Sequence, residues 1–140
     1  MSLLNFFKPS QPLVMVVDDN PMLLEMYEVF LEFLNCKCIK VSDSREALAA
    51  AETHKPHLIL MDIAMPELTG LQVLEMLKLK SATKNIPVLM ITGEHSTGDI
   101  ETAFRLGAAD YLVKPADRVH FEQKVKPLLA LSGYSFPETK

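Results

Sequence analysis

The sequence has no tryptophan, only two cysteines and no block of basic residues. Two cysteines are too few for a disulfide framework, and a zinc site would need further ligands near them. We therefore expect Cys36 and Cys38, which form a C-x-C pair, to be reduced thiols that fill space in a cytoplasmic protein. The formal net charge of −4, with no basic block to offset it, argues against a nucleic-acid-binding surface.

Long apolar runs are also missing, and none approaches the roughly 20 residues that a membrane-spanning helix needs. The opening MSLLNFFKPSQP lacks the basic start and the apolar stretch of a signal peptide. With 140 residues, 49% of them apolar, the chain is long enough for one domain with a core. We expect that domain over residues 12–132. An N-terminal tail over 1–11, part of which can stem from cloning, and a C-terminal tail or shortened linker over 133–140 would flank it.

Short apolar runs alternate five times with segments of helical periodicity. The runs are typical of buried strands and cover residues 13–17, 37–41, 58–61, 88–91 and 111–113. The segment after the first run has apolar residues on one helix face, as at Leu23, Tyr27 and Phe30. This alternation predicts a parallel sheet with right-handed crossovers and helices on both faces. The predicted fold is α/β, a flavodoxin-like doubly wound (βα)5 three-layer sandwich with strand order 2-1-3-4-5.

Helix boundaries are marked by residues with known end preferences. Pro21 suits the first turn of a helix, with Asp19 or Asn20 before it as the N-cap. Asp43 and Glu46 have the spacing of a capping box, with Asp in place of Ser or Thr.

Two further residues predict where helices end or deform. Gly107 suits a left-handed helix end before the last strand. Pro127 falls inside the last helical segment, where it removes a backbone hydrogen bond, so we expect a kink or a break there.

Polar side chains follow the predicted strands where ligands bind in such sheets, beyond the carboxyl ends near the reversal of strand order. Asp18 and Asp19 follow the first strand, and Asp62 follows the third. Thr92 follows the fourth strand and Lys114 the fifth. Because the first and third strands flank the reversal, we expect the three carboxylates to meet in one crevice.

Three carboxylates in one crevice repel one another and raise one another's pKa values. A divalent cation would offset that repulsion, and Mg²⁺ suits a small site that retains water ligands. With Lys114 and the hydroxyl of Thr92, such a site has the groups for phosphoryl transfer. Asp62 would be the nucleophile and would form an aspartyl phosphate, and Gly93 would leave room for the group to enter.

Four segments in this order carry a resemblance to a known family: VMVVDDNP, LILMDIAMPELTG, VLMITGE and GAADYLVKP. Over about residues 12–131 the chain resembles the response-regulator receiver domains of two-component signalling, the chemotaxis regulators among them. The resemblance implies that Asp62 accepts a phosphoryl group from a phosphohistidine on a sensor histidine kinase or a histidine phosphotransfer protein. It further implies a cytoplasmic signalling domain rather than an enzyme, a monomer or weak homodimer that binds neither nucleic acid nor membrane, and a downstream effector that the sequence does not identify.

The resemblance also implies a metal site. Asp18 and Asp19 would hold Mg²⁺, or Mn²⁺ in its place, with Asp19 the more direct ligand. Asp62 and the main-chain carbonyl of Ala64 would complete the protein ligands.

A switch is implied as well. Thr92 would be drawn toward the phosphoryl group and the ring of Tyr111 would turn inward, although Tyr111 could also be a simple core residue. The surface of the fourth helix, fifth strand and fifth helix would then change shape and select partners. The bond between Lys114 and Pro115 is expected to be cis.

The sequence departs from the family pattern at a few positions. Thr69 stands where an Asp often precedes the glycine, and we expect little effect. Ala64 and Glu94 occupy positions that influence how fast the phosphoryl group is hydrolysed, which leaves its lifetime open. We expect the four histidines to be structural or exposed. His95 is set apart from the others because it lies in the loop after Thr92.

Two other functions are weighed against the receiver. A phosphorylation-independent docking module would have lost an acidic, hydroxyl or lysine position, and none is lost. An aspartate-nucleophile phosphatase of the haloacid-dehalogenase type would need a second Asp two residues after Asp62, where the chain has Ala64.

Overall fold

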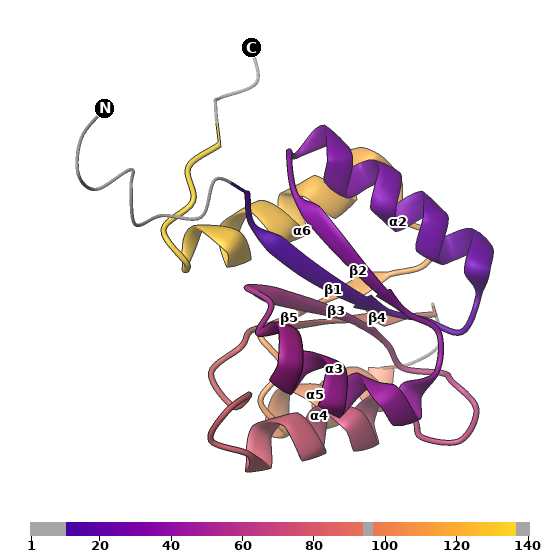
Figure 1. The fold of residues 1–140 in the computed structure, drawn as a ribbon. Helices are drawn as coiled ribbons and strands as arrows, with labels where there is room; N and C mark the ends of the chain where they lie inside the picture. Colours follow the sequence, from indigo (N-terminus) through magenta and orange to yellow (C-terminus); the bar gives the residue numbers. More distant parts are fainter. Residues whose placement is uncertain (1–10, 94–96, 137–140) are drawn as a thin grey trace.

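The structure is a computed structural model that describes residues 11–93 and 97–136 (Figure 1). Every predicted strand is present, and three of them are one residue longer than the apolar runs. In chain order the elements are β1 (Leu13–Val17), α2 (Pro21–Phe33), β2 (Lys37–Val41), the short 3-10 helix η1 (Ser44–Glu46), α3 (Ala47–His54), β3 (Leu58–Asp62), α4 (Gly70–Leu79), β4 (Val88–Thr92), α5 (Thr97–Arg105), β5 (Asp110–Val113) and α6 (Arg118–Ala130).

The five strands form one parallel sheet in the order β2-β1-β3-β4-β5, which confirms the predicted topology. The register sets the strand ends level with one another: Val17 pairs with Met61, and Asp62 pairs with Ile91. The residues that follow these strands therefore lie side by side at one edge of the sheet. This is the edge where the strand order reverses between β1 and β3.

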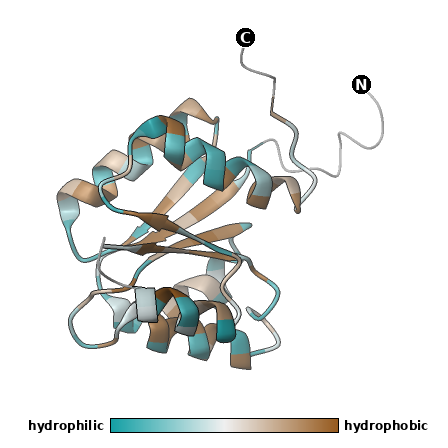
Figure 2. Ribbon diagram, turned by 180° about the vertical axis from the view of Figure 1, so that it is seen from behind, coloured by the Kyte–Doolittle hydropathy of each residue, from teal (hydrophilic) through white to brown (hydrophobic). Residues whose placement is uncertain are grey.

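Helices cover both faces of the sheet and make three layers. Helices α2 and α6 lie on one face, and α3, α4 and α5 lie on the other (Figure 1). The strands are apolar along most of their length, and the polar residues of the helices face outward (Figure 2). One core cluster packs under α2 and α6 around Tyr27 and Phe121, whose rings stack with centroids 5.8 Å apart. The other fills the space under the remaining helices around Met61 and Leu74.

Local sequence explains most helix ends. Asn20 caps α2, because its side chain accepts hydrogen bonds from the backbone N–H groups of Met22 and Leu23, and Pro21 fills the first helical position. Gly107 has a φ of 104° just past α5, which is the left-handed conformation that the sequence predicts.

The expected capping box at Asp43 is wrong. Its carboxylate accepts from the backbone N–H of Arg45 and caps η1, and α3 begins one turn later, with no side-chain cap from Glu46. The Arg45 guanidinium lies 2.7 Å from the same carboxylate. Competition from this ion pair and the tighter 3-10 turn account for the difference.

The expected break at Pro127 is also wrong, because α6 runs through it from Arg118 to Ala130. Pro127 is exposed and stands in the last turn of the helix. Its ring therefore faces solvent, and the carbonyl left without a backbone donor can bind water instead. A bend without a break stays a prediction.

Both cysteines are free thiols, as expected. Cys36 is buried and Cys38 half-buried, and both pack against the cluster under α2 and α6. Burial raises the pKa of Cys36 to about 11 and that of Cys38 to about 12.

The segment after α6 lies against the edge where the strands begin. The hydroxyl of Tyr134 is 3.4 Å from His57 Nε2 and 3.5 Å from the backbone carbonyl of Gln11. The other ring nitrogen of His57 accepts from the backbone N–H of Leu13 at 2.9 Å. No helix in the described part of the chain is long and apolar enough to cross a membrane.

Candidate functional site

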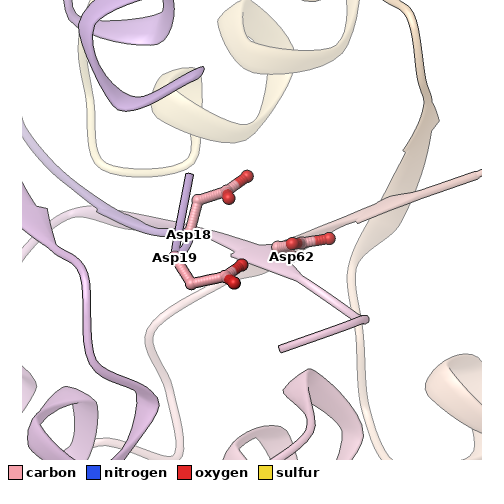
Figure 3. Close-up of side chains that lie close together, drawn as sticks. All are labelled: Asp18, Asp19 and Asp62. Atoms are coloured by element: carbon pink, nitrogen blue, oxygen red, sulfur yellow. The ribbon is translucent and has the colours of Figure 1, made fainter. Parts of the chain in front are cut away.

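The carboxyl ends of β1 and β3 bring three predicted site residues together. Asp18 and Asp19 follow β1, and Asp62 ends β3, so their side chains gather at one point of the sheet edge (Figure 3). One carboxylate oxygen from each lies within 4.8 Å of the others. Asp18 and Asp62 are buried, whereas Asp19 is exposed at the mouth of the crevice.

Lys114 enters the same crevice from the end of β5. Its Nζ lies 3.0 Å from Asp62 Oδ1 and 3.6 Å from Asp18 Oδ2. The backbone N–H of Lys114 donates to the carbonyl of Thr92 at 2.7 Å, which ties the start of this loop to β4. The bond between Lys114 and Pro115 is cis, as expected.

Burial dominates the electrostatics of the two inner carboxyls. It raises the pKa of Asp62, and the neighbouring Asp18 raises it further, while the hydrogen bond from Lys114 acts in the opposite direction. Burial also raises the pKa of Asp18, against the hydrogen bond that it accepts from the backbone N–H of Asn20. One lysine therefore does not offset the cost of holding two ionised carboxylates in this crevice.

The two carboxylate oxygens of Asp18 differ in their hydrogen bonding. Oδ1 accepts from the backbone N–H of Asn20 at 2.9 Å. Oδ2 is, among the described residues, the one buried side-chain N or O atom with no hydrogen-bond partner. A buried carboxylate oxygen without a donor is costly, and a divalent cation between Asp18, Asp19 and Asp62 would satisfy it. The residues present therefore fit a hard cation with oxygen ligands.

The loop after β3 starts beside the crevice, directly after Asp62, and is held tightly at its base. The backbone N–H of Gly70 donates to the carbonyl of Ile63 at 2.8 Å. A Cβ at Gly70 would stand 2.1 Å from the carbonyl oxygen of Asp62, so only glycine fits at this approach. Ala64, the expected carbonyl ligand, is exposed in this loop.

Thr92 and Tyr111, the expected switch pair, have separate contacts. Thr92 is buried, and its hydroxyl donates to the carbonyl of Gly93 at 3.3 Å. The ring of Tyr111 meets the ring of Phe104 edge-on at 6.0 Å, and Lys124 Nζ lies 4.8 Å above it. Their joint movement stays a prediction, and Glu94 and His95 lie outside the described residues.

Two groups near the site are absent from the sequence-based expectations. Thr69 and Gln72 form a capping box at the start of α4, each side chain accepting from the other residue's backbone N–H. The T-x-x-Q pattern could have identified it. The hydroxyl of Ser44 bonds to the loop after β3 at Pro66 and Leu68. No local pattern marks it, because its partners are more than 20 residues away.

Comparisons with known proteins agree with this geometry. The family model "Response regulator receiver domain" matches residues 14–126. The chain is 34% identical over 116 residues to the polar-differentiation response regulator DivK of Brucella anthropi, covering 83% of this chain and 94% of DivK. It is 33% identical over 127 residues to the alkaline phosphatase synthesis transcriptional regulatory protein PhoP of Bacillus subtilis, covering 91% of this chain and 52% of PhoP.

One similar protein of known structure contains a metal ion. The receiver domain of the sensor histidine kinase PA1611 from Pseudomonas aeruginosa has a magnesium ion coordinated in its active site cleft. It superposes with a TM-score of 0.79 at 26% identity, covering 86% of this chain and 99% of that one. The present chain spans about half the length of PhoP but nearly all of DivK and of this receiver domain. The chain thus belongs to the response regulator receiver domains, the signalling domains of two-component systems, which interact with histidine kinases and downstream effectors.

Proposed function

We propose that the domain is a phospho-acceptor, in which Asp62 takes a phosphoryl group from a phosphohistidine on a sensor kinase or a histidine phosphotransfer protein. A carboxylate oxygen of Asp62 would form the new O–P bond as the N–P bond of the donor breaks. The electron pair of that bond would stay on the imidazole nitrogen, which takes a proton from solvent. Asp62 would then carry an aspartyl phosphate.

One observation carries this proposal: Lys114 Nζ lies between the two buried carboxylates, close to Asp62 and too far from Asp18 Oδ2 to satisfy it. Such a site needs positive charge beyond that of Lys114, and a divalent cation bound to the carboxylates would supply it. A divalent ion at Asp18, Asp19, Asp62 and the carbonyl of Ala64 would neutralise charge on the transferred group. The magnesium site of the PA1611 receiver domain supports Mg²⁺ as this ion.

Lys114 and Thr92 would hold the transferred group. Lys114 already faces Asp62 and would exchange that contact for a phosphoryl oxygen, whose fuller negative charge binds the ammonium more strongly. The hydroxyl of Thr92 has only a 3.3 Å contact with the Gly93 carbonyl to give up. Because Thr92 ends β4 and Lys114 follows the neighbouring strand β5, their new positions would change the surroundings of Tyr111 on β5.

The consequence for partners would be a change on the face formed by α5, β5 and α6. Tyr111 would leave its edge-on contact with Phe104 and turn toward Thr92, which reshapes that face. We place this signalling in the cytoplasm, where the donor kinases have their phosphohistidines, and take residues 12–132 as the domain. The effector that binds the changed face is a partner protein rather than nucleic acid.

The experiment that tests the proposal is phosphorylation by acetyl phosphate with Mg²⁺, read as the intact mass of the protein. We expect the wild type to gain one phosphoryl group and Asp62→Asn to gain none, because the amide is not a nucleophile. Chelation of Mg²⁺ should abolish the gain. No gain in the wild type, or an equal gain in Asp62→Asn, would contradict the proposal, and rapid turnover of unrelated phosphate esters would indicate a phosphatase.

A further inference from the structure

Ser44 is a buried polar residue that belongs to neither the core nor the carboxylate cluster. It starts η1, just after β2, and only 4% of it is exposed. Its hydroxyl donates to the backbone carbonyl of Pro66 at 3.0 Å and accepts from the backbone N–H of Leu68 at 3.1 Å. One hydroxyl therefore joins the loop after β2 to the loop after β3.

The two hydrogen bonds bracket a residue in an unfavourable conformation. Glu67, between Pro66 and Leu68, has a φ of 67°, in the left-handed region that residues with a Cβ seldom occupy. Such a conformation persists only where the surroundings hold it. The hydroxyl of Ser44 supplies that restraint on both sides of Glu67.

The backbone on either side of Ser44 is held by interactions of its neighbours, Asp43 and Arg45. The Asp43 carboxylate caps η1 through the backbone N–H of Arg45 at 2.9 Å and pairs with the Arg45 guanidinium. The loop after β3 is thus held at two places, at its base by Gly70 and at its tip by Ser44. A cavity of about 330 Å³ lies between the two loops and reaches Asp19.

Ala64 lies between Ile63, whose carbonyl accepts from the N–H of Gly70, and Pro66, whose carbonyl accepts from the hydroxyl of Ser44. Its backbone carbonyl is the one main-chain group among the proposed cation ligands, and it lies in the loop after β3. A carbonyl in a short loop points where the loop conformation directs it. Any group that fixes this loop therefore also fixes the direction of the carbonyl.

We propose that Ser44 is a positioning residue for the cation site: its hydroxyl holds the loop after β3 so that the carbonyl of Ala64 faces Asp18, Asp19 and Asp62. The inference rests on the proposed phospho-acceptor function. Ser44 touches neither the cation nor the phosphoryl group, and it acts through Pro66 and Leu68. Its loss should weaken cation binding and leave the chemical step unchanged once the cation is bound.

The test compares Ser44→Ala with Thr83→Val. Thr83 is a matched control, because it is equally buried and its hydroxyl donates to the carbonyl of Leu77 at 2.7 Å. Its loop precedes β4 and so lies at the opposite edge of the sheet from the site. Both variants lose one buried hydroxyl, but only Ser44→Ala frees the loop that contains Ala64.

Two readouts separate binding from chemistry. The rate of phosphoryl gain from acetyl phosphate is measured by intact mass over a range of MgCl2 concentrations. The rise in melting temperature with MgCl2 gives the affinity for the cation without any phosphoryl transfer. For Ser44→Ala we expect the half-saturating Mg²⁺ concentration to rise about tenfold, the low end of the effect for groups that orient metal ligands. The rate at saturating Mg²⁺ should stay within about twofold of the wild type, since the nucleophile is unchanged.

Ser44→Thr keeps the hydroxyl and should restore most of the affinity for Mg²⁺, while Thr83→Val should leave it at the wild-type value. An unchanged half-saturating concentration in Ser44→Ala, or an equal rise in Thr83→Val, would overturn the inference. If Ser44→Ala does not fold, Ser44→Cys keeps the size and weakens both hydrogen bonds, and an unchanged affinity there overturns the inference equally. A wild type that takes up no phosphoryl group would instead overturn the proposed function, whatever its affinity for Mg²⁺.

Discussion

Gly70 packs its Cα against the backbone carbonyl of Asp62, so closely that an added Cβ would lie 2.1 Å from the carbonyl oxygen and 2.8 Å from the Cα of Ile63. The neighbouring atoms are backbone at the buried end of β3, and they cannot move aside as a flexible side chain could. The proposed nucleophile and the first residue of α4 are thus in direct contact through their main chains.

We predict that Gly70→Ala lowers the free energy of unfolding by about 2 kcal/mol or more, in the range for overpacking of a core. Urea unfolding followed by circular dichroism measures the change. Gly98→Ala is the control, because nothing lies within 4 Å of a Cβ at that position in α5, and alanine there should stabilise by about 0.5–1 kcal/mol. Equal effects of the two changes would contradict the close contact.

Removal of the Asp18 carboxylate should abolish stabilisation by Mg²⁺. Binding to the folded state alone raises the stability of the wild type by about 2.7 kcal/mol at 100 times Kd. Asp18→Asn should show little of this rise in thermal unfolding with MgCl2. Asp110→Asn is a suitable control, since Asp110 pairs with Lys124 away from the carboxylate cluster.

Without a divalent cation, the carboxylate of Asp18 should lower the stability of the folded protein at pH 7. Burial raises the pKa of Asp18 in the folded state, so the folded state binds the proton more tightly than the unfolded state does. The carboxylate therefore costs stability at pH 7, and the wild type regains that stability as the pH falls through the raised pKa. In chelator at pH 7 we expect Asp18→Asn to be more stable than the wild type, with a difference that shrinks toward pH 4. A less stable variant at pH 7 would contradict this.

The two cysteines should react slowly with alkylating reagents in the native protein. Burial raises their pKa values to about 11 and about 12, so at pH 8 the thiolate of Cys36 is about one part in 1,000. We predict alkylation by iodoacetamide to be at least about 100-fold slower in buffer than in urea, measured by mass. Comparable rates in the two conditions would show that one thiol is accessible and ionised.

Pro127 should cost stability. It is exposed in the last turn of α6, and proline is about 3 kcal/mol less favourable than alanine in a helix interior, with less lost near an end. We predict that Pro127→Ala raises the free energy of unfolding by about 1–2 kcal/mol in urea. A loss of stability instead would mean that the ring makes a contact that the helix needs.

The sequence predicts what local patterns determine. Unbroken apolar runs such as Leu58–Met61 identify buried strands. Pro21, with Asp19 or Asn20 before it as the cap, identifies the start of α2, because the interactions join neighbours in the chain. The carboxylate cluster follows from the topology once the strands are ordered. The contact between Gly70 and Asp62 and the bridge from Ser44 to Pro66 were not predicted, since they depend on how separate loops come together in space.

The limits of local patterns also explain the two wrong predictions, the capping box at Asp43 and the break at Pro127. Asp43 had the right spacing for a capping box, but Arg45 competes for its carboxylate, and a spacing rule takes no account of that third residue. Pro127 was expected to kink or break a helix, but it stands exposed in the last turn of α6, where the carbonyl that loses its backbone donor can bind water. Its exposure became known only with the packing of α6. Residue type alone gave the right interaction partners only where no third group intervened.

The contact of Tyr134 with Gln11 and His57 brings the start and the end of the described chain to the same edge of the sheet (Figure 1). The three carboxylates lie at the opposite edge, and the five residues of β1 separate the two edges by about 17 Å. The sheet thus acts as a spacer. A fluorophore or a fused protein attached beyond either end would leave the mouth of the crevice open to a donor.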